Sequence, residues 1–191
     1  MSRREMSVER LQSFSDGVFA VVITILVLDL RSPESATWSS LATIWPTAVS
    51  YAVSYLFVAI AWLNHHHLLQ HADSVRPKLI WANFAHLFAV SLLPFVTSWM
   101  STSHLAAVPV CLYAGVFVLV NISYIALCME AVDASHGESV FDQMKGKMRM
   151  RAVVTLLLFL VAGVVALWHP VWGFCMVTAC LLSYLRPSTE M

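Results

Sequence analysis

The sequence predicts an all-helical membrane protein with six transmembrane helices and both termini in the cytoplasm. Three observations predict this class: the composition, six apolar segments and the distribution of the basic residues. Hydrophobic residues make up 59% of the 191 residues and charged residues 12%, whereas soluble domains average about 45–50% and about 25%. With a mean hydropathy of +0.75, the chain has too little polar surface to cover a soluble globule.

Six apolar segments are candidate spans of a single six-span domain, residues 1–191. A helix needs about 20 residues to cross the hydrocarbon core, with a range of about 17–25, so the first, fifth and sixth segments are short. The first could also be interfacial or re-entrant, because its uncharged stretch is only Gly17–Leu28. The runs are continuous, whereas barrel strands alternate. The segments are Phe14–Leu30, Leu41–Leu63, Leu79–Trp99, Ala106–Met129, Ala152–Trp168 and Val171–Leu185.

The basic residues set the orientation. With six spans, both termini share a side with the connections between spans two and three and between spans four and five. That side would hold ten of the eleven basic residues, and the other side only Arg31. The positive-inside rule then places both termini in the cytoplasm of a multi-pass cell-membrane protein. The ten residues are Arg3, Arg4, Arg10, Arg76, Lys78, Lys145, Lys147, Arg149, Arg151 and Arg186.

Several functional classes are disfavoured by missing features. Eleven basic residues balance eleven acidic ones, so no charge surplus indicates nucleic-acid binding. The sequence has no nucleotide-binding glycine loop, no HExxH motif, no helix of spaced arginines and no TVGYG-like filter. We therefore expect no cofactor, no bound metal and no enzymatic activity. The longest connection, Ala131–Arg151, is predicted to be a solvated cytoplasmic loop.

The first segment carries a stripe of residues that share one helical face. At 100° per residue, this stripe begins with small residues, passes one hydroxyl and ends in bulkier aliphatic side chains. Small residues such as these commonly mark tight helix packing in lipid, so the residues alone leave a packing face and a pore lining as alternatives. The stripe contains Gly17, Ala20, Val21, Thr24 and Leu28, with Ile25 at its margin.

Charged residues at the start of this segment indicate contacts with neighbouring helices. Asp16 lies where a carboxylate is favoured by a helix N-terminus. Arg10 precedes it by six residues and would point in a different direction from the same helix. Ionisable groups near membrane segments usually face a protein interior and have partners. We expect Arg10, Ser15 and Asp16 to tie the helix to its neighbours.

Three motifs together resemble those of the endolysosomal potassium channel family and its prokaryotic homologues. The first is an RxxxFSD signature, Arg10-x-x-x-Phe14-Ser15-Asp16-Gly17-Val18-Phe19-Ala20. The others are Trp62-Leu63-Asn64-His65-His66 and Ser91-Leu92-Leu93-Pro94-Phe95. The resemblance implies a single-repeat channel that conducts K⁺ in preference to Na⁺, passively, as a homotetramer in a lipid bilayer.

The resemblance also implies roles for individual residues. The first helix of each subunit would line the pore, with rings from Val21, Thr24, Ile25 and Leu28. Val21 stands where a longer Ile or Leu is usual in the family, so Ile25 or Leu28 could form the narrowest ring. A structural polar cluster would contain Arg10, Phe14, Ser15, Asp16, His65 and His66.

Other features leave alternatives open. His67 and His71 have the i, i+4 spacing that can hold a metal, with Asp73 nearby. The remaining histidines are single and scattered, which argues against a membrane metalloenzyme. A proton-coupled transporter or proton leak channel would use Asp16 and the histidines.

In the third span Pro94 should kink the helix, with Ser91 satisfying the freed carbonyl. Tryptophans at the span ends are typical of interfacial belts.

Overall fold

The computed structural model describes residues 7–133 and 138–184, with side chains for 7–131 and 150–184. Within these residues the regular structure is entirely helical, which confirms the all-helical prediction at this level. Eight helices follow one another in the order α1 (Val8–Leu28), α2 (Trp38–Thr43), α3 (Trp45–Leu69), α4 (Pro77–Ser91), α5 (Leu93–Thr102), α6 (Ala107–Asp133), α7 (Glu138–Ala166) and α8 (Pro170–Tyr184).

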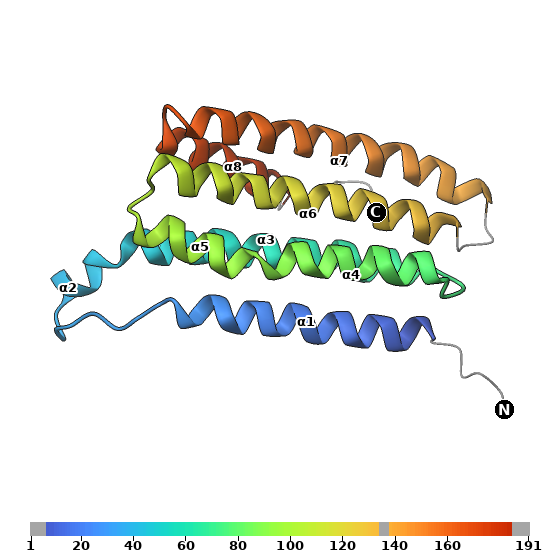
Figure 1. Ribbon diagram of the computed structural model, residues 1–191, viewed down its shortest axis with the longest axis horizontal. Coiled ribbons are helices and arrows are strands. Elements are labelled where there is room, and N and C mark those ends of the chain that lie inside the picture. The colour runs from blue at the N-terminus through green and yellow to red at the C-terminus, as the bar shows by residue number, and fades with distance from the viewer. Residues whose placement is uncertain (1–6, 134–137, 185–191) are drawn as a thin grey trace.

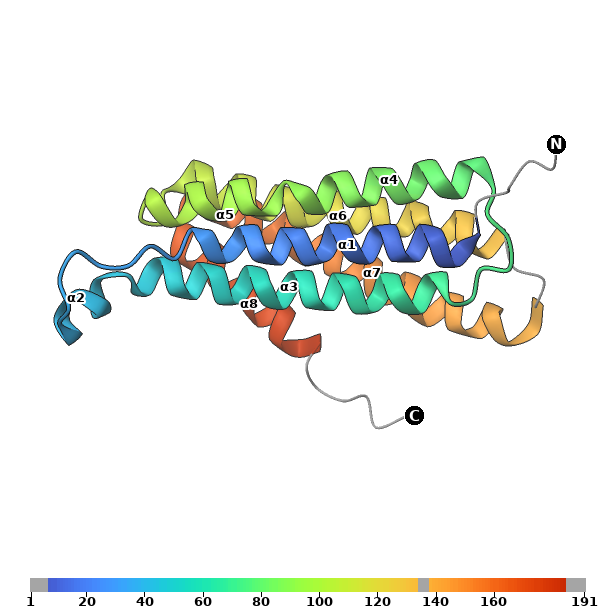
Figure 2. The same ribbon diagram turned by 90° about the horizontal axis from the view of Figure 1, so that it is seen from below.

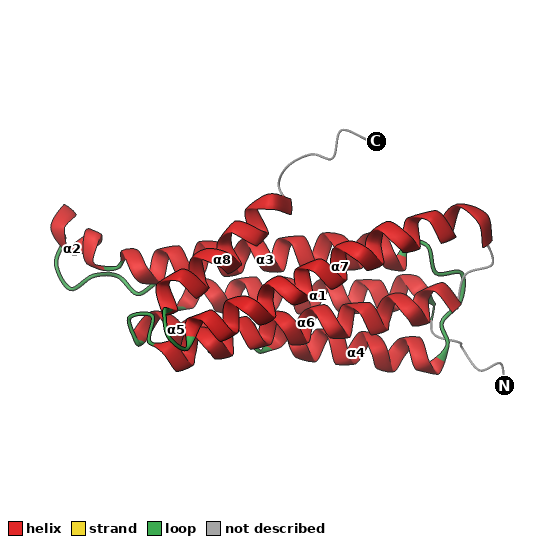
Figure 3. Cartoon of the chain, turned by 90° about the horizontal axis from the view of Figure 1, so that it is seen from above, coloured by secondary structure: helices red, strands yellow, loops and turns green. Residues whose placement is uncertain are grey.

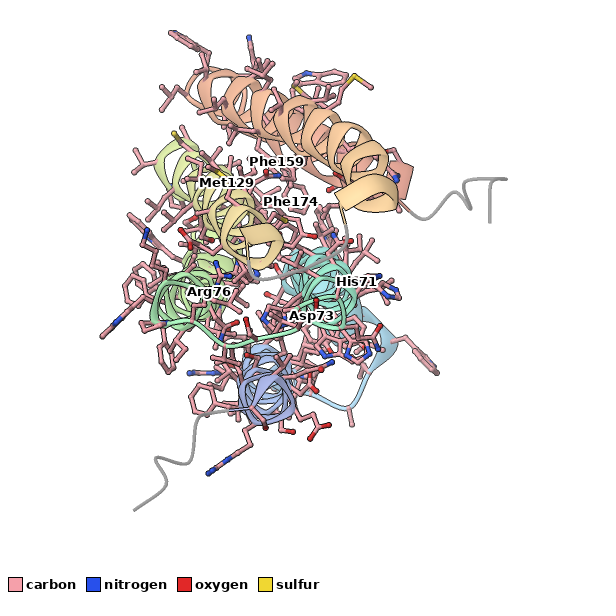
Figure 4. The ribbon with its side chains drawn as sticks, turned by 90° about the vertical axis from the view of Figure 1, so that its right-hand side faces the viewer. His71, Asp73, Arg76, Met129, Phe159 and Phe174 are labelled. Carbon is pink, nitrogen blue, oxygen red and sulfur yellow. The ribbon has the colours of Figure 1, made fainter. Side chains whose placement is uncertain are left out.

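The helices form an elongated bundle with α1 at one edge. All of them except the short α2 run roughly along the long axis of the molecule (Figure 1). α1 packs against α3, α4 and α5, whereas α6 packs against α4, α5, α7 and α8. Seen along the axis from the end with His71, Asp73 and Arg76, α1 and α7 lie on opposite sides (Figure 4). One side of α1 is therefore uncovered by its own chain.

Among the described residues, four helical stretches are long and apolar enough to cross a membrane: Val8–Leu28, Trp45–Leu69, Pro77–Thr102 and Ala107–Ala131. The third combines α4 and α5. Two shorter apolar helical stretches, Met150–Ala166 and Pro170–Tyr184, correspond to the fifth and sixth predicted segments. The predicted end of the sixth segment, Leu185, lies outside the described residues. Each of the six apolar segments thus overlaps a helix.

The first helix is longer than the apolar segment that predicted it. α1 begins at Val8, where the Ser7 side chain accepts a hydrogen bond from the Arg10 backbone N–H, and Glu9 lies in its first turn. Both features favour a helix start. The six additional residues include polar side chains, so hydropathy alone does not mark this turn. α1 therefore has the length of a spanning helix rather than of a short interfacial piece.

The second span differs from its prediction at both ends. α2 covers the first residues of the predicted segment and the three residues before it, and is capped by Thr37, whose hydroxyl accepts the Ser40 N–H at 3.2 Å. α3 then begins at Trp45, with Pro46 in its first turn, where the missing N–H costs no hydrogen bond. It continues past Leu63 to Leu69. His65 and His66 are consequently helical residues, not residues at a span end.

The third span is broken, as the proline predicts. α4 ends at Ser91 and α5 begins at Leu93, directly before Pro94, which lacks a backbone N–H. The predicted role of Ser91 is wrong, however. Its hydroxyl donates to the Phe88 carbonyl oxygen at 2.7 Å, whereas the carbonyl that Pro94 leaves without a helical donor is that of Val90.

The expected cytoplasmic loop over residues 131–151 is largely helical, which corrects that prediction. α6 continues to Asp133 and α7 begins at Glu138. Lys, Glu, Gln and Met in this stretch are good helix formers in water, so helix continues where hydropathy falls. Of the basic residues used for orientation, Arg3, Arg4 and Arg186 lie outside the described residues, as do the side chains of Lys145, Lys147 and Arg149.

An aromatic core joins α3 to α6 and α7. Phe57 stacks on Phe117 with ring centroids 3.8 Å apart, and Phe159 meets Phe117 edge-on at 5.2 Å. Next to this stack, Ser54 forms hydrogen bonds with the Tyr113 hydroxyl at 2.9 Å and with Thr97 at 2.8 Å. All three are buried polar groups that satisfy one another. This aromatic stack contains no residue of α1, but Phe19, Val22 and Leu26 of α1 belong to the same buried hydrophobic cluster.

Candidate pore helix and its polar support

The buried face of α1 holds the helix against its own chain. Leu11, Ser15, Phe19, Val22 and Leu26 are buried and recur every three or four residues, the spacing of one helical face. Phe19 also packs against the rings of His65 and His86, with centroid distances of 5.3 and 6.3 Å. This face contacts α3, α4 and α5.

The four expected pore residues lie together on the opposite, exposed face of α1. Val21 is 55% exposed, Ile25 44% and Leu28 74%, and Thr24 is also exposed. Gly17 and Ala20 of the same stripe are exposed too, and a Cβ added at Gly17 would meet no atom within 4 Å. Tight packing within the chain therefore does not explain these small residues.

Thr24 presents its oxygen rather than its hydroxyl proton. Its Oγ1 donates to the Val21 carbonyl oxygen at 2.8 Å. The hydroxyl has a single proton, so that bond leaves only lone pairs directed away from the helix. An exposed acceptor oxygen thus stands in the middle of an otherwise aliphatic stripe.

A buried polar chain links α1 to α4 and α3. The Ser15 hydroxyl donates to the Leu11 carbonyl at 2.9 Å and accepts from Asn83 Nδ2 at 3.0 Å. Asn83 Oδ1 lies 2.7 Å from His65 Nε2, and because an amide oxygen only accepts, His65 donates from Nε2. Ser15, His65 and Asn83 have no exposed surface in the chain.

A second, more exposed set of contacts links α1 to α3. The Trp62 indole N–H donates to Asp16 at 2.7 Å, and the Gln12 amide donates to His66 Nδ1 at 2.6 Å. At the other end of α1, the Ser98 hydroxyl of α5 donates to Asp29 at 3.2 Å. α1 is thus hydrogen-bonded to its neighbours near both ends.

The remaining members of the expected cluster make weaker contacts. Phe14 is exposed and meets Phe84 of α4 edge-on, with ring centroids 5.6 Å apart. Arg10 is exposed on the first turn of α1. Among the described residues its guanidinium makes no hydrogen bond or ion pair, so its structural role stays a prediction.

Sequence reasoning missed three members of this network: Gln12, Asn83 and the part played by Trp62. An interfacial belt accounts for a tryptophan near a span end, but the Trp62 indole N–H donates to Asp16. Asn83 shares the buried face of α4 with Leu79, Leu87 and Val90. An amide among the apolar residues of a membrane-type helix is the signal that could have identified it.

Two histidines expected to be unrelated lie side by side. The His86 ring is parallel to that of His65, with centroids 5.8 Å apart and an interplanar angle of 6°. The histidines with metal-binding spacing are arranged differently, because a His71 ring nitrogen lies 2.7 Å from the His67 carbonyl oxygen. In the described part of the chain, no three His, Cys, Asp or Glu side chains converge as metal ligands would.

Comparison with known proteins tests the resemblance. Residues 10–94 match the family model of the endosomal/lysosomal potassium channel TMEM175. Over these residues the chain is similar to the TMEM175 family. The resemblance inferred from the RxxxFSD run is thereby confirmed. The TMEM175 match includes the exposed face of α1 and every member of the Ser15–Asn83–His65 chain.

Bacterial relatives and a solved structure extend this result. A protein named as a potassium channel from Chryseobacterium sp. (strain P1-3) is 44% identical over 122 residues, 64% of each chain. One from Streptomyces collinus, also named as a potassium channel, is 32% identical over 138 residues, 66% of each chain. The matched region thus spans just under two thirds of these relatives. The crystal structure of a lysosomal potassium-selective channel TMEM175 homologue from Chamaesiphon minutus superposes with a TM-score of 0.83 at 23% identity, covering 93% of this chain and 95% of that one. This match shows the TMEM175 fold.

Proposed function

We propose that the chain is the subunit of a homotetrameric channel that conducts K⁺ passively and in preference to Na⁺. The observation that carries this proposal is the two-faced character of α1. Its buried face and hydrogen bonds attach it to α3, α4 and α5, while Val21, Thr24, Ile25 and Leu28 are exposed at the edge of the bundle. Four such edges placed around an axis would enclose a path lined by α1, whereas one subunit encloses none.

The selectivity would come from a narrow aliphatic ring. An ion passing a dry hydrophobic constriction must shed part of its hydration shell, and this costs less for the larger, more weakly hydrated K⁺ than for Na⁺. The outward-facing oxygen of Thr24 could replace one water at that point. Val21 is shorter than the aliphatic residue usual at its position, so Ile25 or Leu28 would form the narrowest ring.

The proposed topology has six spans in the cell membrane and cytoplasmic termini. The start of α1, the α3–α4 connection and the facing ends of α6 and α7 lie at one end of the bundle (Figure 1). That end carries Arg10, Arg76, Lys78 and the basic first part of α7, whereas Arg31 follows the opposite end of α1. The positive-inside rule assigns the basic end to the cytoplasm. Met150–Ala166 and Pro170–Tyr184 would complete the six spans.

The alternative is a proton-coupled transporter or proton leak channel. Asp16 accepts a hydrogen bond from Trp62, and His66 accepts one from Gln12. These contacts give both groups structural partners. The bacterial relatives are named as potassium channels, which favours K⁺ as the conducted ion. No catalytic step is part of the proposal.

The deciding experiment is electrophysiology on the full chain reconstituted in planar bilayers. With K⁺ on one side and Na⁺ on the other, we expect the current to reverse at a non-zero voltage, with the K⁺ side negative. A reversal potential at zero would contradict K⁺ selectivity. A pH-driven current that persists after all K⁺ is replaced by an impermeant cation would instead support the proton alternative.

A further inference from the structure

A cavity with no residue of α1 in its wall lies among the other helices. It has a volume of about 320 Å³ and is lined from α3, α4, α6, α7 and α8. α8 packs against both α3 and α7 and ends part-way along the bundle (Figures 2 and 3), where Leu181 and Tyr184 form part of the wall. The wall includes the exposed Leu63 and Arg151 as well as the buried Phe159. The cavity therefore extends from the surface of the bundle, beside the end of α8, into its core.

The wall changes from polar to apolar with depth. On α7, Arg151, Thr155 and Phe159 line the cavity at intervals of four residues and share one helical face. The first and the last are eight residues apart, which is about 12 Å along a helix. On α3, Asn64 and Phe57 belong to the same wall. Because α3 ends and α7 begins at the same end of the bundle (Figure 1), the polar group of each helix lies nearer that end and the aromatic ring lies deeper.

Arg151 gives the cavity an unbalanced positive charge. None of the described residues that line it is Asp or Glu. The Arg151 guanidinium lies over the Tyr184 ring, 5.4 Å from its centroid, which is a cation–π distance. Within the described part of the chain it makes no hydrogen bond or ion pair, so its N–H groups remain available. The planar guanidinium suits a phosphate group, which can accept two of its N–H bonds at once.

Arg151 lies at the level of lipid head groups in the proposed topology. It stands at the start of the apolar stretch Met150–Ala166, and that start is on the cytoplasmic side. Lys147 precedes Arg151 by four residues in α7, so the two positions share a helical face. Basic pockets between transmembrane helices on the cytoplasmic side bind phosphate-bearing head groups. The cavity thus combines a phosphate-binding group at the membrane surface with an apolar interior.

We propose that this cavity binds an anionic phospholipid of the cytoplasmic leaflet. Arg151 binds the phosphate, and one acyl chain lies against Phe57, Phe159 and Leu181. A soluble anion would leave this apolar part of the wall unused. The inference uses the proposed span of α7 but not the proposed pore, because no residue of α1 is in the wall. Lipid binding can therefore be measured whether or not the chain conducts K⁺.

The test is native mass spectrometry of the detergent-solubilised full chain. The protein is titrated with phosphatidylglycerol or with phosphatidylcholine of identical acyl chains. We expect phosphatidylglycerol to bind about fivefold more tightly, the factor that one basic residue contributes near a membrane surface. Excess inorganic phosphate at constant ionic strength should not displace it, because the acyl chain also holds the lipid. Equal affinities for the two lipids, or displacement by inorganic phosphate, would overturn the proposal.

One pair of variants tests the head-group contact. Arg151→Gln should lower the affinity for phosphatidylglycerol about fivefold, to that for phosphatidylcholine. Arg76→Gln is the matched control, since Arg76 is an exposed arginine at the same end of the bundle but does not line the cavity. It should leave the affinity unchanged. An equal loss in both variants would indicate general attraction to a basic surface and would contradict a site at Arg151.

A second pair tests the position of the acyl chain. Phosphatidylglycerol with a diazirine in one acyl chain is irradiated with the full chain in liposomes, and the label is located by mass spectrometry. We expect label on Phe159 and Leu181, and Ala152→Phe, which narrows the cavity, should remove it. Val153→Phe, on the exposed face of α7, is the control and should retain it. Label confined to exposed residues such as Leu157 would place the chain in bulk lipid and overturn the proposal.

Discussion

Leu28 is the most exposed of the four expected pore residues and lies at the last turn of α1, with 74% of its surface uncovered. In the proposed tetramer it forms an aliphatic ring. Leu28→Ala should widen that ring and admit more water, because a dry constriction depends on its diameter. We expect single-channel conductance to rise and the K⁺/Na⁺ permeability ratio to fall, measured from reversal potentials in mixed K⁺ and Na⁺ solutions. Unchanged values for Leu28→Ala, Ile25→Ala and Val21→Ala alike would place the constriction elsewhere.

Thr24 should affect selectivity in a different way. Its oxygen faces away from the helix while its proton is bonded to the Val21 carbonyl. Thr24→Ala deletes the acceptor, and Thr24→Ser keeps it while removing a methyl group. We expect the alanine variant to lower the K⁺/Na⁺ ratio with little gain in conductance, and the serine variant to retain the ratio. Equal ratios in the two variants would show that the oxygen has no part in selection.

Asn83 should matter more for stability than any other residue of the polar support. Replacing it by leucine leaves the His65 N–H buried without an acceptor, at a cost of about 1–3 kcal/mol. It also removes the donor to Ser15, which keeps its own bond to the Leu11 carbonyl. We expect Asn83→Leu to lower the thermal transition of the detergent-solubilised protein, followed by size-exclusion chromatography after heating. Phe84→Leu is the control, since Phe84 is 38% exposed beside it. A transition equal to that of the control would contradict a structural role for the chain.

At the scale of the helix, one face of α1 should be accessible to water and the opposite face should not. Cysteines placed at Val21, Thr24 and Leu28 should react with a charged thiol reagent and block current, whereas cysteines at Val22 and Leu26 should not. Val22 and Leu26 are 3% and 0% exposed. A background lacking the exposed Cys175 is needed.

A further control separates pore water from lipid. Leu157 of α7 is 55% exposed, as Val21 is, but in the proposed channel it faces lipid. A cysteine at Leu157 should therefore stay unreactive towards a charged reagent. Reaction at this position equal to that at Val21 would remove the evidence that α1 faces an aqueous path.

The contact between α7 and α8 depends on a glycine. A Cβ added at Gly173 would lie 2.6 Å from the Ala166 Cβ and 2.8 Å from the Ala162 carbonyl oxygen, whereas one at Gly115 would meet nothing within 4 Å. Gly173→Ala should destabilise the folded protein by about 1–3 kcal/mol through overpacking. Gly115→Ala, also in a helix, should be neutral or stabilising. Urea unfolding followed by tryptophan fluorescence would compare them, and equal midpoints would contradict the close approach.

Sequence patterns predicted the elements better than their ends or their contacts. Pro94 predicts the break between α4 and α5, because proline cannot donate a backbone hydrogen bond. The first turn of α1 and the last turns of α3 contain polar residues, so hydropathy places these ends wrongly although the backbone continues as helix. The pairing of His65 with His86 joins two helices, and no periodicity within one helix reveals such a contact.

In the candidate site, too, features within one helix could be predicted from the sequence, whereas contacts between helices could not. The stripe from Gly17 to Leu28 could be read from the sequence, because its members share one face of a single helix. Asn83 and Trp62 could not be assigned, since their roles depend on which side of α4 and α3 meets α1. Exposure of the stripe in one chain agrees with a pore lining, but the lining itself requires further copies.

At the scale of the whole molecule, α1 lies at one edge of the bundle, and the aromatic stack lies among the other helices. Phe57, Phe117 and Phe159 join α3, α6 and α7 without using α1. In the proposed tetramer, this aromatic stack would stay within each subunit while the exposed face of α1 meets the other copies. The α1 face that would meet other copies is free of the contacts that hold the subunit together.

The hydrogen bonds near both ends of α1 have a mechanical consequence. Ser15 and Asp16 are bonded near one end, and Asp29 is bonded to Ser98 at the other, a separation of about 20 Å along a helix. A helix that is attached at two such points resists tilting about either of them. In the proposed tetramer, the pore between four such helices would therefore have a fixed diameter. That diameter would depend on the side chains that line the pore rather than on the tilt of the helices.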